Sequence, residues 1–556
     1  MSQVGDVSGP TPATGLPSAL DAESAASGLF ARKSSGLVRE ISLSGAFGIN
    51  LGVMSIGAAF AYFVLLMTTF PLQNGFWTLL IGGILIMCLV WVYGQLATTM
   101  PRSGGDYLYA GRIFHPAVGA WVGFALLGLL WWSLDSAAPY LVDSFIPPVF
   151  ADLGSWLHIS FFTTLSGDIA TKSGTVITCV VILIATFALL ASGVRIATSS
   201  AYWFTIAALI GALGIIAELF FHGNSTFIHQ FNGASGSSHA YQSVIAQARA
   251  HGWTPGYTTS ATINAIPFTF LAYGSFWFSA YAGGEVKRPA RTQFLAQILA
   301  ISIGVAVVVL GWVAITSLSS THFMQASAYL QANDPTAWAK ITTVATTPQG
   351  YATIVTGGAF VNFALALLFA VGIFPVFVAF VLSMSRTLFA FSFDRLLPEW
   401  VADVRGRHHA PLAAMVVSFV VVAPLFYLVV YSTGFTAAFH NVISIGAGLA
   451  LVASIGVVAL PYRRKQLYRA SPEIAPGTWF GVPRVVFIGT FSIVYCAVIL
   501  YLTLFHKQWN GGFTTSSIIV LLVMATGGIF IYGIVYAIRR RQGVDLSLVM
   551  RELPPD

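Results

Sequence analysis

Charged side chains are scarce in this chain of 556 residues. Asp, Glu, Lys and Arg together make up 8% of the sequence, whereas 56% of the residues are hydrophobic. A soluble protein carries about a quarter charged residues, because its surface must face water. The shortage of charge therefore excludes an ordinary soluble protein and predicts that lipid surrounds most of the chain. In such a protein, the informative feature behind the net charge of +7 is where the cations lie relative to the membrane. The charge does not indicate a nucleic-acid partner.

Cysteines and a secretion signal are also lacking. The three cysteines, Cys88, Cys179 and Cys496, lie in separate apolar segments. Such scattering excludes a disulfide framework and a clustered zinc site, so we expect no metal and no cofactor. Residues 1–30 have no cationic start followed by an apolar run, and they are rich in Ser, Gly, Ala and Pro. This composition predicts a disordered tail and no signal peptide.

Long apolar runs, in contrast, are abundant. A helix needs about 20 apolar residues to cross the hydrocarbon core of a bilayer. Twelve stretches satisfy this length, and we expect an all-α polytopic membrane protein with 12 transmembrane helices. The stretches are 43–69, 75–99, 117–146, 174–192, 198–221, 263–283, 293–318, 355–384, 411–431, 437–460, 483–505 and 515–538.

The positions of the cations orient these segments. If the N-terminus is cytoplasmic, 22 of the 26 Lys and Arg residues fall on the inner side. The four on the outer side are Lys172, Arg249, Lys340 and Lys507. Cytoplasmic loops of membrane proteins carry an excess of Lys and Arg, so both termini are predicted to be cytoplasmic. The two long loops, 222–262 and 319–354, then lie outside, where "AYQSVIAQARA" and "FMQASAYLQA" are expected to form short helices.

Two of the predicted helices contain interruptions. The inner half of the first carries Gly45, Gly48, Asn50, Gly52, Ser55 and Gly57, and the sixth carries Gly274-Ser275 near its middle. The two segments lie five helices apart. In transporters with inverted repeats, paired discontinuous helices meet at the membrane midplane, and their ends face the substrate. Glycines also let helices pack closely, as in "GINLG", and this alternative stays open.

Three motifs resemble those of the amino acid–polyamine–organocation (APC) transporter superfamily. "AYGSFWFSAYAGGEVKRPAR" (272–291) is similar to the signature of its sixth helix. "MPRSGGDYLYAGRIFHPAVGAWVGF" (100–124) is similar to the segment between helices two and three. "MSRTLFAFSFDRLLPEWVADVRGRHHAPLAA" (384–414) resembles the motif after helix eight. "ASGVR" (191–195) resembles the family's G-V-K before helix five.

The resemblance implies a five-plus-five inverted repeat of the leucine-transporter type, with helices 1 and 6 discontinuous. The implied parts are a disordered cytoplasmic tail (1–38), a first repeat (39–222), an outer loop (223–262), a second repeat (263–460), two further helices (461–538) and a cytoplasmic C-terminal tail (539–556). It also implies a secondary active transporter of amino acids in the cell membrane, working by alternating access with proton symport or exchange.

By the same resemblance, the substrate meets the interrupted helices. The implied binding residues are Met54, Ser55, Ile56, Gly57, Ala58, Leu271, Ala272, Tyr273, Gly274, Ser275, Phe276 and Trp277. The sequence departs from the family at two coupling positions. Trp277 replaces an acidic residue, and Ala208 occupies the place of a helix-five lysine. Helix eight offers Pro375 and Val376 where a sodium site needs hydroxyl groups. Sodium coupling and the lysine mechanism are therefore not expected.

Asp135 is the carboxylate deepest inside a predicted span. An ionisable residue at this depth is a functional hypothesis by default, so we expect it to bind a substrate amine or to carry a coupling proton. A structural, hydrogen-bonded Asp135 is the alternative. Trp131 is a candidate for the pocket wall, and Glu285 and Lys287 for an inner gate, with Arg386 or Asp394 as partners.

Motifs of enzymes are absent: the chain has no H-E-x-x-H zinc site and no P-loop. We therefore expect no enzyme activity. A channel, a substrate sensor and a transporter of polyamines or other organic cations remain alternatives, although a polyamine needs several carboxylates and a channel commonly shows a filter or rings of charge. The expected partners are a small amino acid or related amine, the lipid bilayer and protons. The particular substrate, the coupling ion and the oligomeric state are left open.

Overall fold

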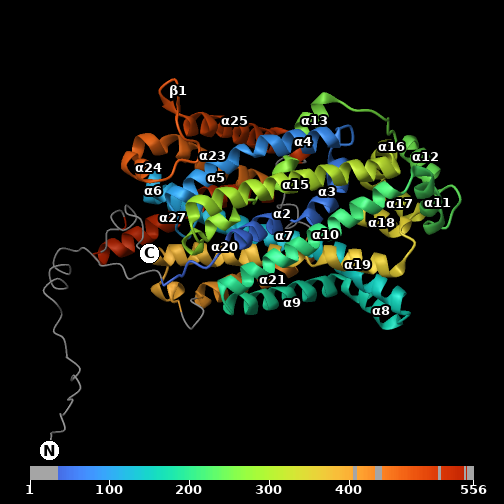
Figure 1. Cartoon of the computed structure of the whole chain (residues 1–556), viewed down its shortest axis with the longest axis horizontal. Coiled ribbons are helices and arrows are strands. Elements are labelled where there is room, and N and C mark those ends of the chain that lie inside the picture. The colour runs from blue at the N-terminus through green and yellow to red at the C-terminus, as the bar shows by residue number, and fades with distance from the viewer. Residues whose placement is uncertain (1–35, 405–409, 433–440, 511–514, 544–545, 547–556) are drawn as a thin grey trace, which may run out of the picture. The chain divides into compact units, whose positions relative to one another are not determined.

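Long α-helices make up most of the computed structural model, which describes residues 36–404, 410–432, 441–510, 515–543 and 546. The described residues from 37 to 546 belong to one compact unit. Most of the two predicted tails, 1–38 and 539–556, lies outside the described residues. Within the described part, 11 helices or helix pairs are long and apolar enough to cross a membrane. Figure 1 shows most of them running side by side along one direction.

In the described part of the first half of the chain, the regular elements are α-helices. They are α2 (Leu43–Met54), α3 (Ile56–Thr69), α4 (Gly75–Ile86), α5 (Cys88–Thr99), α6 (Asp106–Ile113), α7 (Pro116–Leu157), α8 (Ser160–Ile169), α9 (Lys172–Ala191), α10 (Val194–Phe221), α11 (Asn224–Ala234), α12 (Ala240–Ala250), α13 (Thr259–Ala265) and α14 (Phe268–Tyr273).

The second half adds three short 3-10 helices, η1 to η3, and a two-stranded hairpin. Its elements are η1 (Phe278–Tyr281), η2 (Gly283–Glu285), α15 (Pro289–Ser319), α16 (Thr321–Asn333), α17 (Pro335–Ile341), α18 (Pro348–Val355), α19 (Ala359–Ala370), α20 (Ile373–Phe393), η3 (Glu399–Ala402), α21 (Leu412–Tyr431), α23 (Asn441–Arg463), α24 (Lys465–Ala470), β1 (Thr478–Trp479), β2 (Val482–Pro483), α25 (Arg484–Phe505), α26 (Lys507–Asn510) and α27 (Thr515–Arg541).

Eleven of the twelve predicted spans correspond to these long helices. The exception is the sixth, 263–283, which is not a continuous helix: α13 and α14 are short, and η1 and η2 follow them. The third span is longer than predicted, because α7 continues past residue 146 through Pro147 and Pro148 to Leu157. Proline ordinarily interrupts a helix. Here α8 packs along the extension, and the hydroxyl of its Ser166 donates to the carbonyl of Pro147 at 2.7 Å.

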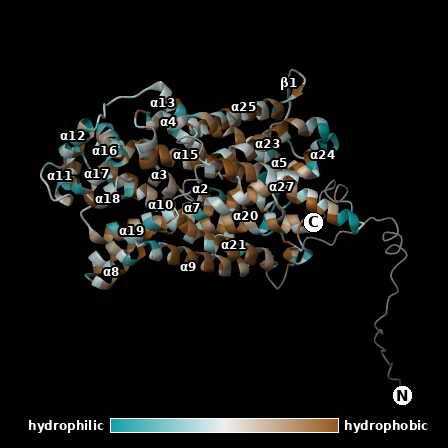
Figure 2. Cartoon of the chain, turned by 180° about the vertical axis from the view of Figure 1, so that it is seen from behind, coloured by the Kyte–Doolittle hydropathy of each residue, from teal (hydrophilic) through white to brown (hydrophobic). Residues whose placement is uncertain are grey.

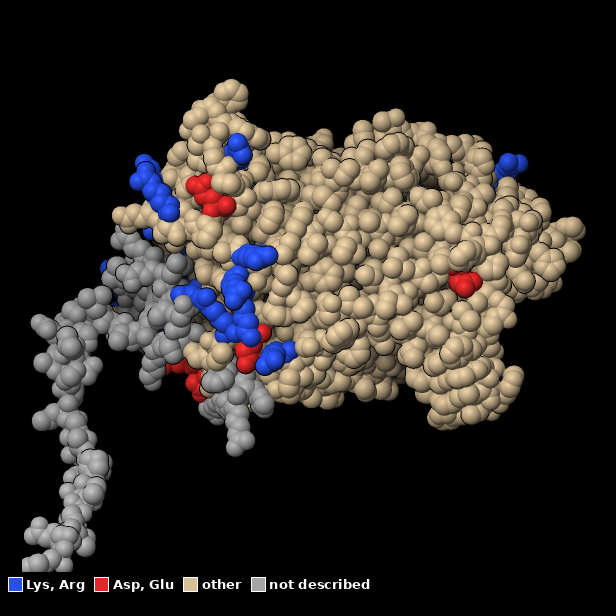
Figure 3. All heavy atoms as spheres, viewed as in Figure 1, with Lys and Arg blue, Asp and Glu red and all other residues tan. Residues whose placement is uncertain are grey.

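The two ends of the helix bundle differ in composition. We call one the cationic end; it contains residues 100–115, 282–291, 386–404 and 463–484. We call the other the distal end; it contains α8, α11, α12 and α16–α18. Figure 3 shows Lys and Arg gathered at the cationic end, and Figure 2 shows apolar residues along the helices between the two ends. The helices expected in the two long loops are confirmed as α12 and α16, which contact each other.

The helix α2 lies at the centre of the bundle, where every residue from Gly45 to Met54 is buried. It packs against α10, α15 and α20. A Cβ atom on Gly48 would lie 2.5 Å from the Cα of Tyr202, and one on Gly52 would lie 2.3 Å from the Cβ of Pro375. These two glycines therefore serve close helix packing, as in the alternative interpretation of "GINLG". The interruption lies just beyond them, at Ser55.

Candidate functional site

The first helix breaks at a single residue. Ser55 separates α2 from α3 and has a φ of 45°, in the left-handed region that residues with a Cβ rarely adopt. Its N–H donates to the carbonyl of Gly52 at 3.1 Å, and its hydroxyl oxygen accepts from the N–H of Ala58 at 3.2 Å. Ser55 is thus the N-cap of α3. The break exposes the C-terminal end of α2 and the N-terminal end of α3 at the same depth.

The sixth segment breaks more widely. α14 ends at Tyr273, and residues 274–277 lead into η1 without α-helical structure. A Cβ on Gly274 would lie 2.2 Å from the carbonyl oxygen of Phe270, so this position requires glycine. Ser275 has a φ of 76°. Strained residues of this kind persist where the surrounding structure holds them, and they cluster at functional sites.

Buried amide side chains compensate the irregular backbone of η1. Asn50 of α2 accepts from the N–H of Ser279 at 2.8 Å. Gln293 of α15 donates to the carbonyl of Ser279 at 3.1 Å, and it accepts from the Ser279 hydroxyl at 2.8 Å. Non-helical backbone is tolerated at membrane depth only where such partners satisfy it. Asn50 and Gln293 therefore hold the cationic-end half of the broken segment in place.

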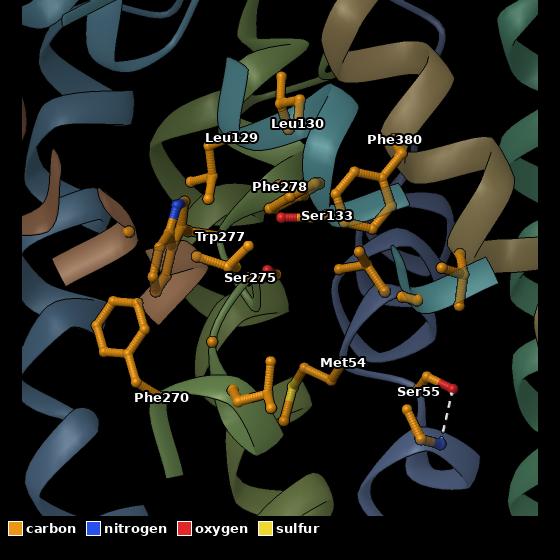
Figure 4. Close-up of a pocket in the computed structure, with 18 of the residues that line it drawn as sticks. Met54, Ser55, Leu129, Leu130, Ser133, Phe270, Ser275, Trp277, Phe278 and Phe380 are labelled. Carbon is orange, nitrogen blue, oxygen red and sulfur yellow. Dashed lines mark hydrogen bonds between the residues drawn. The ribbon is translucent and has the colours of Figure 1, made fainter. Parts of the chain in front are cut away.

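The two breaks border one central cavity of about 90 Å³. Figure 4 shows side chains of the first helix facing those of the sixth across it, with Ser133 and Ser275 pointing into the same space. The lining residues come from six parts of the bundle. They are Val53, Met54, Ser55, Ala58, Tyr62, Tyr93, Leu129, Leu130, Ser133, Ala137, Leu141, Phe270, Leu271, Gly274, Ser275, Trp277, Phe278, Tyr281, Val376, Phe380, Val442, Ile443, Gly446 and Leu449.

Seven of the residues that the sequence predicts for substrate binding line this cavity. They are Met54, Ser55, Ala58, Leu271, Gly274, Ser275 and Trp277. Ala272, Tyr273 and Phe276 do not line it, although they lie in the same segment. Tyr273 faces α4, where its ring lies beside Gly83, and Phe276 packs edge-on against Trp277 at 4.9 Å. Sequence reasoning missed the aromatic residues Tyr62, Tyr93 and Phe380, which lie in none of the quoted motifs. It also missed Phe278 and Tyr281, which lie inside the motif 272–291, because the motif does not show which of its side chains face the cavity.

On α7, the residues that line the cavity are not the ones that the sequence singles out. Leu130, Ser133, Ala137 and Leu141 follow each other at helical spacing and form one face. At about 100° per residue, Asp135 lies roughly opposite Ser133 and Ala137 on the helix. Its side chain is fully buried, and α7 packs against α9. Neither carboxylate oxygen has a hydrogen-bond partner among the described residues. Trp131 also lies off the cavity-lining face.

The cavity has polar groups but, within the described part, no charged side chain. An α-helix leaves its first four N–H groups without partners inside the helix. At the start of α3, the N–H of Ser55 donates to the carbonyl of Gly52, and the N–H of Ala58 donates to the hydroxyl of Ser55. The N–H groups of Ile56 and Gly57 are therefore the ones without a partner inside the helix. The helix ends at Met54 and Tyr273 present carbonyl groups in the same way. A helix N-terminus favours an anionic group and a helix C-terminus a cationic one, so the two breaks suit a zwitterion.

A second, smaller cavity lies on the other side of the break in the first helix. Ile56 and Gly57 line it together with Thr205 and Ala208 of α10 and with Gly372. Ala208, which stands in place of the family's lysine, thus borders the broken helix. The hydroxyl of Thr205 donates to the carbonyl of Gly48 at 3.0 Å. No charged side chain lines this cavity in the described part of the chain. No group of three His, Cys, Asp or Glu residues there could hold a metal ion.

Buried ion pairs close the cationic end. Glu285 receives two hydrogen bonds from Arg386, at 2.6 and 2.9 Å, and both side chains are almost fully buried. This is one of the partners expected from the sequence. Asp394, the other, instead pairs with Arg112 at 2.8 Å and accepts from the hydroxyl of Tyr107 at 2.7 Å. Lys287 has an exposed side chain, and its backbone N–H donates to Ile41 at 2.9 Å.

Comparison with known proteins identifies the family. The model of the family described as amino acid permease matches residues 41–531, and the chain belongs to this family. The predicted membership in the APC superfamily is therefore confirmed, and the chain is a multi-pass membrane transporter rather than an enzyme. Uncharacterized protein 399 of Sulfolobus islandicus rod-shaped virus 1 is 29% identical over 113 residues. This match covers 20% of the chain and 27% of the viral protein.

Proposed function

We propose that this amino acid permease is a secondary active transporter that moves amino acids by alternating access. Family membership supports amino acid transport in general. The observation that carries the finer proposal is the central cavity, which lies where two broken helices meet and has no charged side chain among its described lining residues. A zwitterion can be neutralised there by helix ends alone. A polyamine would bring several positive charges into the cavity without a carboxylate to meet them.

The binding mode follows from the directions of the helix ends. The substrate carboxylate lies at the break in the first helix, where Ser55 borders both cavities, and accepts hydrogen bonds from the N–H groups of Ile56 and Gly57. The ammonium group donates to carbonyls at the ends of α2 and α14. Ser133 and Ser275 offer further hydroxyl groups, and Leu129, Phe278 and Phe380 surround the side chain of the substrate. The apolar wall favours a neutral amino acid. The cavity of about 90 Å³ favours a small one, since a single water needs roughly 10–15 Å³ on the same scale.

The membrane topology extends the same proposal. Residues 263–283 cross the membrane as a broken segment, which makes twelve spans with the eleven long helices. The halves 39–222 and 263–460 are the two inverted repeats, each of which contributes one broken helix, and 461–538 adds two spans. The cationic end faces the cytoplasm by the positive-inside rule, so both termini are cytoplasmic and the protein lies in the cell membrane. Glu285 and Lys287 then lie at the inner gate.

Transport is coupled to protons or to exchange of one amino acid for another. Asp135 is the membrane-embedded candidate for carrying the proton, because it is a buried carboxyl without a partner among the described residues. It lies away from the cavity and would act through the packing of α7 against α9. We expect Asp135→Asn to abolish proton-driven accumulation in proteoliposomes while counterflow exchange continues. Unchanged pH dependence of uptake in this variant would remove Asp135 from the mechanism.

Two measurements on purified protein test the proposed function. A thermal-shift screen against amino acids, amines and nucleobases identifies the ligand class, and we expect neutral amino acids to stabilise the fold. Proteoliposome uptake of the best ligand should then saturate and show counterflow. Large unitary currents would indicate a channel instead. Stabilisation by polyamines alone would contradict the amino acid assignment.

A further inference from the structure

A second buried carboxyl lies beside the central cavity, on a side that the proposed function does not use. Asp106 is the first residue of α6, between the second and third spans, and only 2% of it is exposed. Its Oδ2 accepts from the hydroxyl of Tyr281 at 2.9 Å. The oxygen of Tyr281 in turn accepts from the indole N–H of Trp277 at 2.9 Å. Tyr281 and Trp277 both line the cavity, and Figure 4 shows Trp277 at its edge.

Tyrosines are the titratable groups that face Asp106. Tyr93 of α5 and Tyr281 of η1 act on its carboxyl, and Tyr109 of α6 lies in its field. The parts of α7 and α23 that border the same hollow contribute only apolar residues, such as Val122 and Val452. In the described part of the chain, no cation acts on Asp106. Burial therefore raises the pKa of Asp106 to about 7, and the hydrogen bond from Tyr281 offsets part of this shift.

We propose that Asp106 is a proton-binding site that controls a hydrogen-bond donor in the substrate cavity. When Asp106 is ionised, the hydroxyl proton of Tyr281 is committed to its carboxylate. When Asp106 binds a proton, the new O–H donates to the oxygen of Tyr281, and the Tyr281 hydroxyl turns its own proton into the cavity. The proton remains on Oδ2 of Asp106, and no bond other than hydrogen bonds changes. A substrate carboxylate oxygen that is not held by the N–H groups of Ile56 and Gly57 then gains one donor.

This inference rests on the proposed function, because it assumes that the cavity takes a molecule with a carboxylate. It sets the sign of the coupling: a proton on Asp106 and a carboxylate in the cavity favour each other. Linkage is reciprocal, so a bound substrate also holds the proton more firmly. Binding is therefore tighter on the acid side. We expect affinity for the best amino acid ligand to be about five- to tenfold higher at about pH 6 than at about pH 8.

The test has one arm without ligand and one with it. In the first, infrared difference spectra of purified protein, wild type against Asp106→Asn, follow the carboxyl band through a pH titration. The expected midpoint is near neutral pH, whereas a midpoint near the ordinary value of about 4 would overturn the proposal. In the second, ligand affinity is measured at acid and alkaline pH for the wild type, Asp106→Asn, Tyr281→Phe and the control Asp168→Asn, which changes an exposed carboxyl on α8.

Asp106→Asn is expected to bind with pH-independent affinity. Tyr281→Phe is expected to bind at both pH values as weakly as the wild type does on the alkaline side, and Asp168→Asn should follow the wild type. The Tyr281→Phe variant keeps the test valid if Asp106→Asn does not fold. Wild-type pH dependence in Tyr281→Phe, or amino acid binding with no pH dependence in the wild type, would overturn the inference and leave the proposed function standing. If the infrared titration of the carboxyl band has a midpoint near neutral pH but the protein binds no amino acid, the result would support the proton site and contradict the proposed substrate class.

Discussion

At the scale of single residues, the broken sixth segment depends on polar side chains inside otherwise apolar helices. Asn50 is fully buried on α2, and the oxygen of its side-chain amide accepts a hydrogen bond from the N–H of Ser279. A buried N–H that loses its partner keeps the whole cost of leaving water. The position of η1, and with it Trp277 and Tyr281 at the cavity, therefore depends on a side chain from a different helix.

We expect Asn50→Ala to destabilise the protein by about 1–3 kcal/mol, because the Ser279 N–H is left without an acceptor. Ligand affinity should fall as well, since η1 positions part of the cavity wall. The measurement is the thermal unfolding midpoint in detergent with and without ligand. Asn333→Ala is the matched control, because Asn333 is exposed at the end of α16 and bonds only the preceding turn. Equal midpoints for the two variants would contradict this role of Asn50.

At the scale of helices, the sequence predicts where they lie better than how they are rotated. The break at Gly274-Ser275 can be predicted because a glycine and a polar residue stand inside an apolar run. The break in the first helix is at Ser55, whereas Gly48 and Gly52 before it pack against other helices. Glycine alone does not distinguish close packing from unwinding, since both need a missing side chain. The distinction depends on neighbours far away in the sequence.

The rotation of α7 shows the same limit. Asp135 attracts attention because it is charged, yet the cavity-lining face contains Ser133 and Ala137. An apolar membrane helix has no solvent-facing stripe to reveal its inner face, and neighbouring helices set its rotation. Asp106 was missed for a related reason. It lies in the loop motif after the second span, where a carboxylate is expected to be exposed, and only tertiary packing brings it against Tyr281.

The buried ion pair of Glu285 on η2 and Arg386 on α20 joins two elements, and its contribution to stability can be tested. Removing one partner of a buried pair leaves an uncompensated charge and costs about 3–5 kcal/mol. We expect Glu285→Gln and Arg386→Gln each to lower the thermal unfolding midpoint and to reduce uptake, because the cationic end no longer closes tightly. The double variant should be less destabilised than the sum of the two single variants. Additive effects would show that the pair does not act as a unit. Glu399→Gln, at an exposed position of η3, is the control.

At the scale of the whole molecule, the uneven distribution of cations between the two ends makes orientation testable. The native cysteines Cys88, Cys179 and Cys496 are all buried, so they give little background in a labelling experiment. Lys340 of α17 is exposed at the distal end, and Glu399 of η3 is exposed at the cationic end. The positive-inside rule places the first outside the cell and the second in the cytoplasm. A cysteine at each position therefore reports one side of the membrane.

We expect Lys340→Cys to react with a membrane-impermeant maleimide in intact cells, and Glu399→Cys to react only after the membrane is permeabilised. The wild type, with its buried thiols, should remain unlabelled in both conditions. Both variants should retain ligand binding, because neither residue lines the central cavity. Labelling of Glu399→Cys in intact cells, with protection of Lys340→Cys, would invert the proposed topology. The ion pair of Glu285 and Arg386 would then face the exterior, and proton entry at Asp106 would start from the outer side.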